Sequence, residues 1–297
     1  MSDHIIACFG EILWDLLPGK ELPGGAPMNV AYHLQRLGNP VAMITRIGAD
    51  DYGRRLLALM EQYQLDTRYV QQDTVHETGK VHATVTPEQE MQYDIVYPSA
   101  WDFIRMEPLL EALLQHPPSY LVFGSLSTRN EISRQTLEHL LGMKATKVLD
   151  INLRAPHYHP DQVSWLLEQA DILKLNEHEL ALLANWYDYT GPDETVISAM
   201  AANFGLHTII LTLGSKGCML YTGGQFYYES GHVVTVADTI GSGDAFLAGY
   251  LHSIIKGDAP QQCLHFANAL GAVVAGYHGG CPAYALEEVI AMQQRHQ

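Results

Sequence analysis

The sequence predicts an α/β fold with a mostly parallel β-sheet. Short apolar segments with the length of buried strands alternate with longer amphipathic segments that have the period of helices. We find no internal repeat, low-complexity tract or Pro/Ser-rich linker in the chain. Its 297 residues, of which 47% are hydrophobic, are enough for one large core. Together these observations predict an α/β fold made of either one large domain or two small ones.

The expected elements follow one another as strand, helix, strand. Pro27 in the first turn and Gly38 at the end delimit the first helix, and Asp50 is a suitable cap for the second. Gly223 and Gly224, between two alternating segments, predict a hairpin. The predicted strands are 5–9, 41–47, 120–123, 147–151, 172–175 and 208–213, the hairpin is 217–229, and the main predicted helices are 27–37, 50–63, 243–256, 260–276 and 286–294.

Two segments in the first third of the chain interrupt this alternation. Residues 11–22 follow the first strand without a helix, and residues 78–96 alternate like two strands joined by a turn at 87–90. We expect them to form a small separate β-sheet, a lid made of about residues 11–24 and 70–100. A sheet with one open face usually covers a ligand or a second copy of the chain, so a homodimer through the lid is also predicted.

Charge and cysteine content narrow the class of partner. Lys and Arg number 17 and Asp and Glu 33, which gives a formal net charge of −16. This balance argues against non-specific binding to nucleic acid and against docking on anionic membranes. The N-terminus lacks the features of a signal peptide, and the four cysteines form no Cys-x-x-Cys pair, which predicts a cytoplasmic protein with reduced thiols. His157 and His159 lack a third metal ligand nearby, so we expect a polar loop there.

The densest cluster of chemistry-bearing residues is 238–246, Asp-Thr-Ile-Gly-Ser-Gly-Asp-Ala-Phe, which leads into an apolar helix. The small residues Gly241, Ser242 and Gly243 allow backbone N–H groups to point outward together at the start of a helix, a geometry that binds anions. Asp244 is then placed to accept a proton from a hydroxyl that attacks phosphorus. A glycine-rich turn with a capping aspartate is the structural alternative, which the full string disfavours.

Residues 24–31, Gly-Gly-Ala-Pro-Met-Asn-Val-Ala, form a second cluster. Its glycines permit close approach of backbone to a ligand, although a tight strand-to-helix turn needs the same residues. Together the two clusters resemble the two signatures of the ribokinase-like (PfkB) carbohydrate kinases, and Ser242 stands where that family usually has Ala. Further matches occur in the family's order over nearly the whole chain: 9–11 with Asp15, 36–38, 47–53, 150–154, 176–179 and 212–217. Residues 24–31 and 150–154 look most like the fructokinase branch.

The resemblance implies a ribokinase-like fold: a single doubly wound domain over residues 1–297, with a mostly parallel sheet flanked by helices and a small β-sheet lid. It also implies ATP-dependent phosphorylation of a sugar hydroxyl, first of all D-fructose giving fructose 6-phosphate. It implies that Asp244 is the base and that the amides of Gly241, Ser242 and Gly243 form an anion hole, Ser242 leaving its amide free. Sugar-binding residues would be Asp15, Gly25, Asn29, Asn152 and Arg154. ATP-binding residues would be Asn176, Thr212, Gly214, Gly217, Asn268 and Gly271. Glu179 would hold Mg²⁺ through water, and Asp238 with the carbonyl of Ile240 matches a loop for a monovalent cation such as K⁺.

Several alternatives remain open at this point. Within the same chemistry the acceptor is alternatively ribose, 2-keto-3-deoxygluconate or a nucleoside. A non-catalytic sugar- or nucleotide-sensing protein is a rival class, but the intact Asp244 and anion hole disfavour it. A dinucleotide-binding oxidoreductase would need Gly-x-Gly-x-x-Gly after the first strand, where none occurs. Tyr93, Tyr97 and Trp101 either contact the sugar from the lid or serve only in packing.

Overall fold

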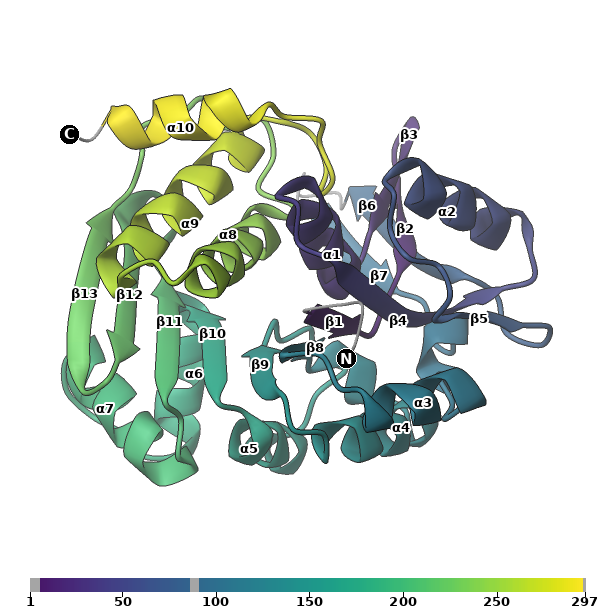
Figure 1. Ribbon diagram of the computed structural model, residues 1–297, viewed down its shortest axis with the longest axis horizontal. Coiled ribbons are helices and arrows are strands. Elements are labelled where there is room, and N and C mark those ends of the chain that lie inside the picture. The colour runs from purple at the N-terminus through teal and green to yellow at the C-terminus, as the bar shows by residue number, and fades with distance from the viewer. Residues whose placement is uncertain (1–5, 86–90, 296–297) are drawn as a thin grey trace.

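A large β-sheet enclosed by helices, with a small sheet beside it, makes up the computed structural model, which describes residues 6–85 and 91–295 (Figure 1). The strands are β1 (Ile6–Phe9), β2 (Leu13–Leu17), β3 (Lys20–Gly24), β4 (Val41–Gly48), β5 (Val70–Asp73), β6 (Gly79–Val85), β7 (Met91–Ile95), β8 (Tyr120–Gly124), β9 (Thr146–Asp150), β10 (Ile172–Asn176), β11 (Thr208–Thr212), β12 (Gly217–Thr222) and β13 (Gln225–Ser230). The α-helices are α1 (Ala26–Arg36), α2 (Asp51–Gln62), α3 (Pro108–Gln115), α4 (Glu131–Leu141), α5 (Pro160–Gln169), α6 (Glu177–Trp186), α7 (Asp193–Phe204), α8 (Ser242–Lys256), α9 (Pro260–Ala275) and α10 (Leu286–Gln294). The predicted strands and helices are present, with ends that differ by one residue at most.

The large sheet has nine strands in the order β13-β12-β11-β10-β9-β8-β1-β4-β5. Neighbours from β11 to β5 are parallel, and β12 and β13 add an antiparallel edge. Helices α1, α2, α8, α9 and α10 cover one face and α3 to α7 the other (Figure 1). This is the predicted doubly wound architecture, in which ligands bind at the carboxyl ends of the parallel strands.

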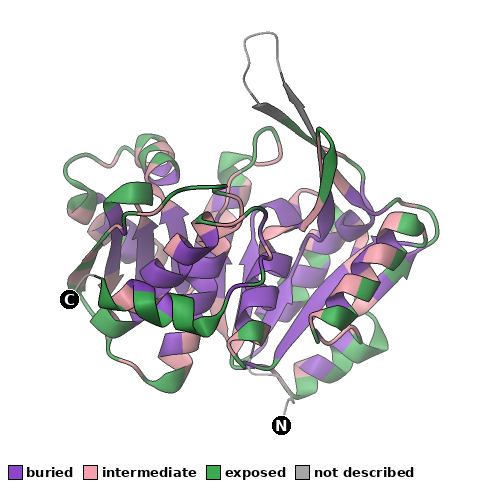
Figure 2. Cartoon of the chain, turned by 90° about the horizontal axis from the view of Figure 1, so that it is seen from above, coloured by how far each residue is buried: buried purple, intermediate pink, exposed green. Residues whose placement is uncertain are grey.

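Burial on both faces explains why the strands are continuously apolar. Phe9 on β1 and Phe123 on β8 are almost wholly buried between the two helical layers. Figure 2 shows the strands of the large sheet as buried and the outer faces of the helices as exposed. Because the strand interiors are apolar, a charged side chain within one of them calls for a specific explanation.

The small sheet has the order β3-β2-β6-β7 and stands above β1 and β4 in Figure 1. It combines the two predicted excursions, because β2 pairs in parallel with β6. The predicted lid boundary is wrong at one place: β5 pairs with β4, so residues 70–73 extend the large sheet instead. The predicted turn at 87–90 lies outside the described residues.

A buried ion pair fixes the base of the small sheet. Arg129 donates to Asp102 at 2.7 Å, with side-chain exposures of 3% and 0%, and also to the carbonyl of Val96, just after β7, at 2.8 Å. Trp101 is fully buried there, and a Cβ on Gly79 would lie 2.6 Å from its indole nitrogen. Trp101 therefore packs at the base of the small sheet rather than on its open face.

Three further observations concern what the described residues contain. No helix within residues 6–85 and 91–295 is both long and apolar enough to cross a membrane. The four cysteines are free thiols. Across the same residues, no group of three or more His, Cys, Asp or Glu side chains is arranged to hold a metal ion by itself.

Candidate functional site at the start of α8

The predicted site residues gather where several parallel strands end. Strand register pairs Asn176 with Thr212 at the ends of β10 and β11, and pairs Asp150, the last residue of β9, with Lys174. Helix α8 begins beside them at Ser242. The site therefore lies at the carboxyl edge of the sheet, in front of a helix N-terminus.

The turn into α8 depends on Gly241. This residue caps the helix with a φ of 76°, in the left-handed region, and a Cβ here would lie 2.4 Å from the Cα of Gly280. Glycine is the residue that meets both requirements. The amides of Ser242, Gly243 and Asp244 form the first turn of α8, where N–H groups have no partner within the helix and the dipole favours an anion.

One expectation about this turn is corrected. The amide of Ser242 donates to the carbonyl of Thr239 at 3.3 Å, and its hydroxyl donates to the same oxygen at 2.9 Å. The amide of Ser242, which was predicted to be free, therefore already donates a hydrogen bond, although a long one. The hydroxyl that distinguishes Ser from the usual Ala is turned back to the loop and braces the turn.

Asp244 is a buried carboxylate at this helix start. Its Oδ2 accepts a hydrogen bond of 2.7 Å from Nδ2 of Asn29. Burial raises the pKa of Asp244 to about 6, and the neighbouring charge of Asp150 adds to this effect. Lys174, the Asn29 hydrogen bond and Arg154 act in the opposite direction. The carboxylate is accordingly a stronger base than an exposed aspartate and is still ionised at neutral pH.

Asn29 links two segments that are far apart in the sequence. Its amide donates to Asp244, while its Oδ1 accepts from the thiol of Cys281 at 3.3 Å. A Cβ on Gly280 would lie 2.5 Å from Asn29 Nδ2, so that glycine allows the close approach. Asn29 was predicted to bind sugar hydroxyls, and in this structure its hydrogen bonds hold the predicted base.

The small sheet contributes Asp15 to the same site. Burial raises the pKa of Asp15 to about 6, and repulsion from Asp238 and Asp244 acts in the same direction. The positive charge of Arg154 acts in the opposite direction. A Cβ on Gly24 would lie 2.5 Å from the Asp15 carboxylate, and one on Gly25, where φ is 111°, would lie 2.4 Å from the carbonyl of Glu11. The di-glycine therefore lets the start of α1 pass close to β2.

Residues after β9 face the small sheet from the other side. Asn152 has a φ of 38°, a left-handed conformation that Asn tolerates better than most residues. Arg154 is exposed and its charge acts on both Asp15 and Asp244. One cation thus acts on two carboxylates, one from the small sheet and one from the first turn of α8.

Most of the predicted nucleotide residues lie at the end of β11, at the start of β12 and on α9. Gly217 must be glycine, because a Cβ would lie 1.9 Å from the carbonyl of Glu229. Asn268 on α9 donates to the carbonyl of Ser230 at 2.7 Å, and β13 pairs that residue with Gly217. Thr212 and Gly214 precede this pair at the end of β11. The structure therefore brings together the end of β11, the start of β12 and one face of α9.

Gly271 has a packing role in the same region. A Cβ there would lie 3.1 Å from the carbonyl of Ser242 and 3.4 Å from Phe246 Cβ, so glycine lets α9 approach the start of α8. Gly271, which was predicted to bind the nucleotide, therefore also sets the spacing between these two helices.

Asn176 and Glu179 form the N-terminal capping box of α6. The Asn176 side chain accepts from the amides of His178 and Glu179, and the Glu179 carboxylate accepts from the amides of Asn176 and Leu153 at 2.8 Å each. Both residues therefore have a structural role at the start of α6. Each Glu179 oxygen keeps a second lone pair, which suits an ion that retains most of its water, as Mg²⁺ does.

Asp238 holds the loop before α8. Its two oxygens accept from the amides of Ile240 at 3.0 Å and Gly279 at 3.3 Å. The carboxylate thereby connects this loop to the segment after α9. Carboxylate and backbone carbonyl oxygens are the donors that a hard cation prefers.

Sequence reasoning missed two charged groups at this site. Glu11 is buried, its Oε2 has no hydrogen-bond partner, and burial raises the pKa of its carboxyl to about 7. Lys174 is buried within β10 and donates to both oxygens of Asp150. For Lys174, the only signal in the sequence was a single cation inside an apolar strand. Asp150 belongs to the matched segment 150–154, but no role was predicted for it.

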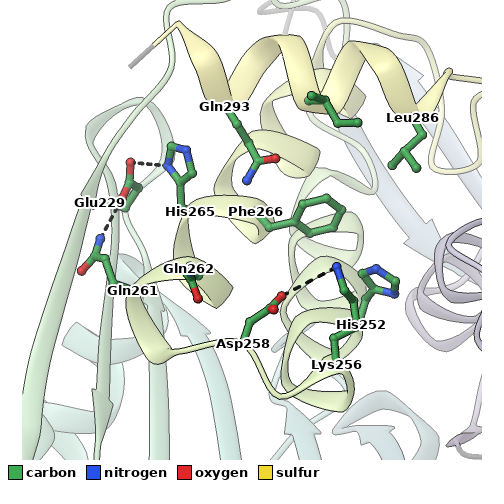
Figure 3. A pocket seen from close by; sticks show the side chains of 11 residues that line it. Glu229, His252, Lys256, Asp258, Gln261, Gln262, His265, Phe266, Leu286 and Gln293 are labelled. Carbon is green, nitrogen blue, oxygen red and sulfur yellow. Dashed lines mark hydrogen bonds and ion pairs between the residues drawn. The ribbon is translucent and has the colours of Figure 1, made fainter. Parts of the chain in front are cut away.

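A separate cavity of about 640 Å³ lies between β13, α8, α9 and α10 (Figure 3). Figure 3 shows His265 directed at Glu229 on one side and Lys256 paired with Asp258 on the other. None of the site residues predicted from the sequence is among its described lining. The cavity is therefore not the site assembled around Asp244.

Comparison with known proteins agrees with this architecture. Residues 18–285 match the model of the pfkB family carbohydrate kinases. The chain is 30% identical to the probable fructokinase-7 of Arabidopsis thaliana, over 95% of this chain and 90% of that protein. It superposes on a fructokinase with bound ATP from Xylella fastidiosa with a TM-score of 0.85 and 22% identity, covering 98% of each chain. A fructokinase double mutant from Vibrio cholerae O395, bound to fructose, ADP and potassium, gives a TM-score of 0.81 and 25% identity over 99% of this chain and 100% of that one. On this evidence the chain belongs to the pfkB family of carbohydrate kinases and is a sugar kinase.

Proposed function

We propose that this sugar kinase transfers the γ-phosphoryl group of ATP to a primary hydroxyl of D-fructose, giving fructose 6-phosphate. The observation that carries the proposal is the buried Asp244 carboxylate at the start of α8, held by Asn29 beside a glycine turn. The fructokinases among the relatives, one of them with fructose and ADP bound, support the choice of acceptor.

In the proposed reaction Asp244 accepts the proton of the attacking hydroxyl while the oxygen forms its bond to phosphorus. The amides of Gly241, Ser242 and Gly243 bind the oxygens of the phosphoryl group in transfer, the Ser242 amide giving up its long hydrogen bond to Thr239 to do so, and the helix dipole adds positive potential there. Such catalysis rests mainly on positioning and electrostatic stabilisation. Closure of the small sheet over the sugar would exclude water and limit ATP hydrolysis.

The substrates are assigned to the two sides of α8. Asp15, Gly25, Asn152 and Arg154 would bind the sugar, because a ring of hydroxyls needs both acceptors and donors. The nucleotide would lie along Asn176, Thr212, Gly214, Gly217, Asn268 and Gly271. Mg²⁺, held through water by Glu179 and by the phosphates, would neutralise phosphate charge. Asp238 and the Ile240 carbonyl are the proposed site for a monovalent cation such as K⁺. A homodimer through the lid and a cytoplasmic location remain predictions.

A screen of acceptors tests the choice of sugar. D-Fructose, ribose, 2-keto-3-deoxygluconate and a nucleoside are each supplied with ATP and Mg²⁺, and acceptor-dependent ADP release is measured. We expect the highest kcat/KM with fructose. A higher value with another acceptor reassigns the substrate within the same chemistry. Absence of turnover with all four, in a protein that still binds ATP, contradicts the proposed function and favours a sensing role.

At acidic pH, kcat should depend on the ionisation of Asp244. Its carboxyl accepts a proton only when ionised, so kcat at saturating fructose is expected to fall below a pH of about 6. The loss should be about tenfold for each further pH unit. Above that pH the carboxylate is ionised and kcat should level off. Circular dichroism at each pH separates this loss from unfolding, and a kcat that stays constant down to pH ~4 would contradict the assignment.

A further inference from the structure

The proposed site contains a buried ion pair that the mechanism above does not use. Lys174 Nζ donates to both oxygens of Asp150, at 2.9 and 2.8 Å, and the two side chains are only 8% and 6% exposed. Lys174 lies in β10 between Leu173 and Leu175, which are fully buried. Burying two charges costs several kcal/mol each before their attraction is counted, and a well-packed apolar pair is often as stable. Stability alone is therefore a weak reason for this pair.

The ammonium of Lys174 lies directly beneath the start of α8. A Cβ on Gly243 would lie 3.3 Å from Nζ, so the glycine leaves room for the ammonium close to the first turn. A cation at a helix N-terminus opposes the helix dipole and is unfavourable by itself. The arrangement becomes favourable when negative charge is also present there, and Asp244 is the next residue.

Charged and titratable groups reach Asp244 from several elements. They are Asp150 on β9, Lys174 on β10, Arg154 after β9, Glu11 after β1, Asp15 on β2 and Cys281 after α9, and the neutral amide of Asn29 on α1 adds a hydrogen bond. Of the two cations in this set, Arg154 is exposed and Lys174 is buried. Salt and water therefore screen the electrostatic effect of Arg154 on Asp244 much more than that of Lys174.

We propose that Lys174 is a positioning residue for phosphoryl transfer: fixed by Asp150 beneath Gly243, its ammonium keeps Asp244 ionised and adds positive potential at the start of α8. The inference rests on the proposed role of Asp244 as the base. Lys174 acts through its charge and reaches neither the sugar hydroxyl nor the phosphorus. Asp150 sets the position of the ammonium, and its own charge acts on Asp244 with the opposite sign.

The two members of the pair should therefore shift the titration of Asp244 in opposite directions. Lys174→Met removes the cation and should raise the midpoint by about 0.5 to 1 pH unit. Asp150→Asn removes the anion, leaves an amide oxygen as a partner for Lys174, and should lower the midpoint by a similar amount. A purely structural ion pair predicts loss of stability in both variants without such a split.

Two measurements determine the midpoint of the Asp244 titration. The first is the acid limb of kcat with saturating D-fructose and ATP-Mg²⁺. The second is the ¹³Cγ chemical shift of Asp244 in the ligand-free, ¹³C-aspartate-labelled protein, assigned by its loss in Asp244→Asn. The second needs no turnover, so failure of the fructose assignment and failure of this inference are distinguishable. On the pH plateau, Lys174→Met should also lower kcat about tenfold or more.

Control variants separate charge from folding. Lys174→Met/Asp150→Asn leaves no unpaired buried charge, and its midpoint should lie between those of the single variants. Arg46→Met removes a cation from the largely buried pair with Asp73. This pair joins β4 and β5, and β4 lies four strands from β10. It should change thermal stability without moving the titration of Asp244. Midpoints that stay at the wild-type value, or that move in the same direction in both single variants, would overturn the proposal.

Discussion

Asp244→Asn is expected to lower kcat for sugar phosphorylation by at least ~10²-fold. The amide has nearly the same shape and its oxygen still accepts a hydrogen bond from Asn29, but it cannot take the proton of the attacking hydroxyl. Because the contacts proposed for the sugar and the nucleotide persist, KM for both should change little. The measurement is acceptor-dependent ADP release at saturating ATP-Mg²⁺.

The control for this variant lies at the other end of the same region. Asp258→Asn makes the same chemical change beyond the C-terminus of α8, where the carboxylate lies 4.0 Å from Lys256 in a solvent-accessible pair. We expect wild-type kcat from it. If Asp244→Asn were to keep a rate similar to that of Asp258→Asn, the assigned base would be wrong and catalysis would rest on the helix N-terminus alone.

Gly241→Ala is expected to impair both stability and turnover. The left-handed conformation at φ 76° costs an alanine about 1–2 kcal/mol. In addition, the new Cβ would lie 2.4 Å from the Cα of Gly280, so the two segments must move apart. Gly280 in turn contacts Asn29, which holds Asp244, so the displacement reaches the proposed base. A shift of about 1 Å there is enough to lower kcat ~10²-fold.

A second glycine, at the other end of α8, serves as a control that separates the effect of backbone strain from the effect of displacing Gly280. Gly257 caps the C-terminus of α8 with a φ of 81°, and nothing lies within 4 Å of its Cβ position. Gly257→Ala should lower the melting temperature through backbone strain alone and leave kcat unchanged. Equal losses of activity in the two alanine variants would show that global destabilisation, and not the contact with Gly280, is responsible.

Much of the fold is encoded locally. The apolar runs that become β1, β8 and β10, the glycine and proline signals around α1, and the hairpin at β12 and β13 depend on neighbouring residues, so one sequence was enough to predict them. The glycine-rich string before α8 is similar, because its conformation needs small residues in order. Strand β5 was misassigned to the lid because nothing within its few residues specifies which sheet it joins.

The sequence alone therefore determined the elements and their order, and it predicted Asp244, Gly241 and Asp15 as site residues. The tertiary structure decided which groups meet: Asn29 contacts Asp244 across 215 positions, and Lys174 contacts Asp150 across 24. It also decided the ionisation of these groups, since burial and neighbouring charges, absent from any local pattern, raise the pKa of Asp244 to about 6. The physical reason is that hydrogen bonds and electrostatic interactions depend on distance in space, and the chain sets that distance only when the sheet and its helices have packed.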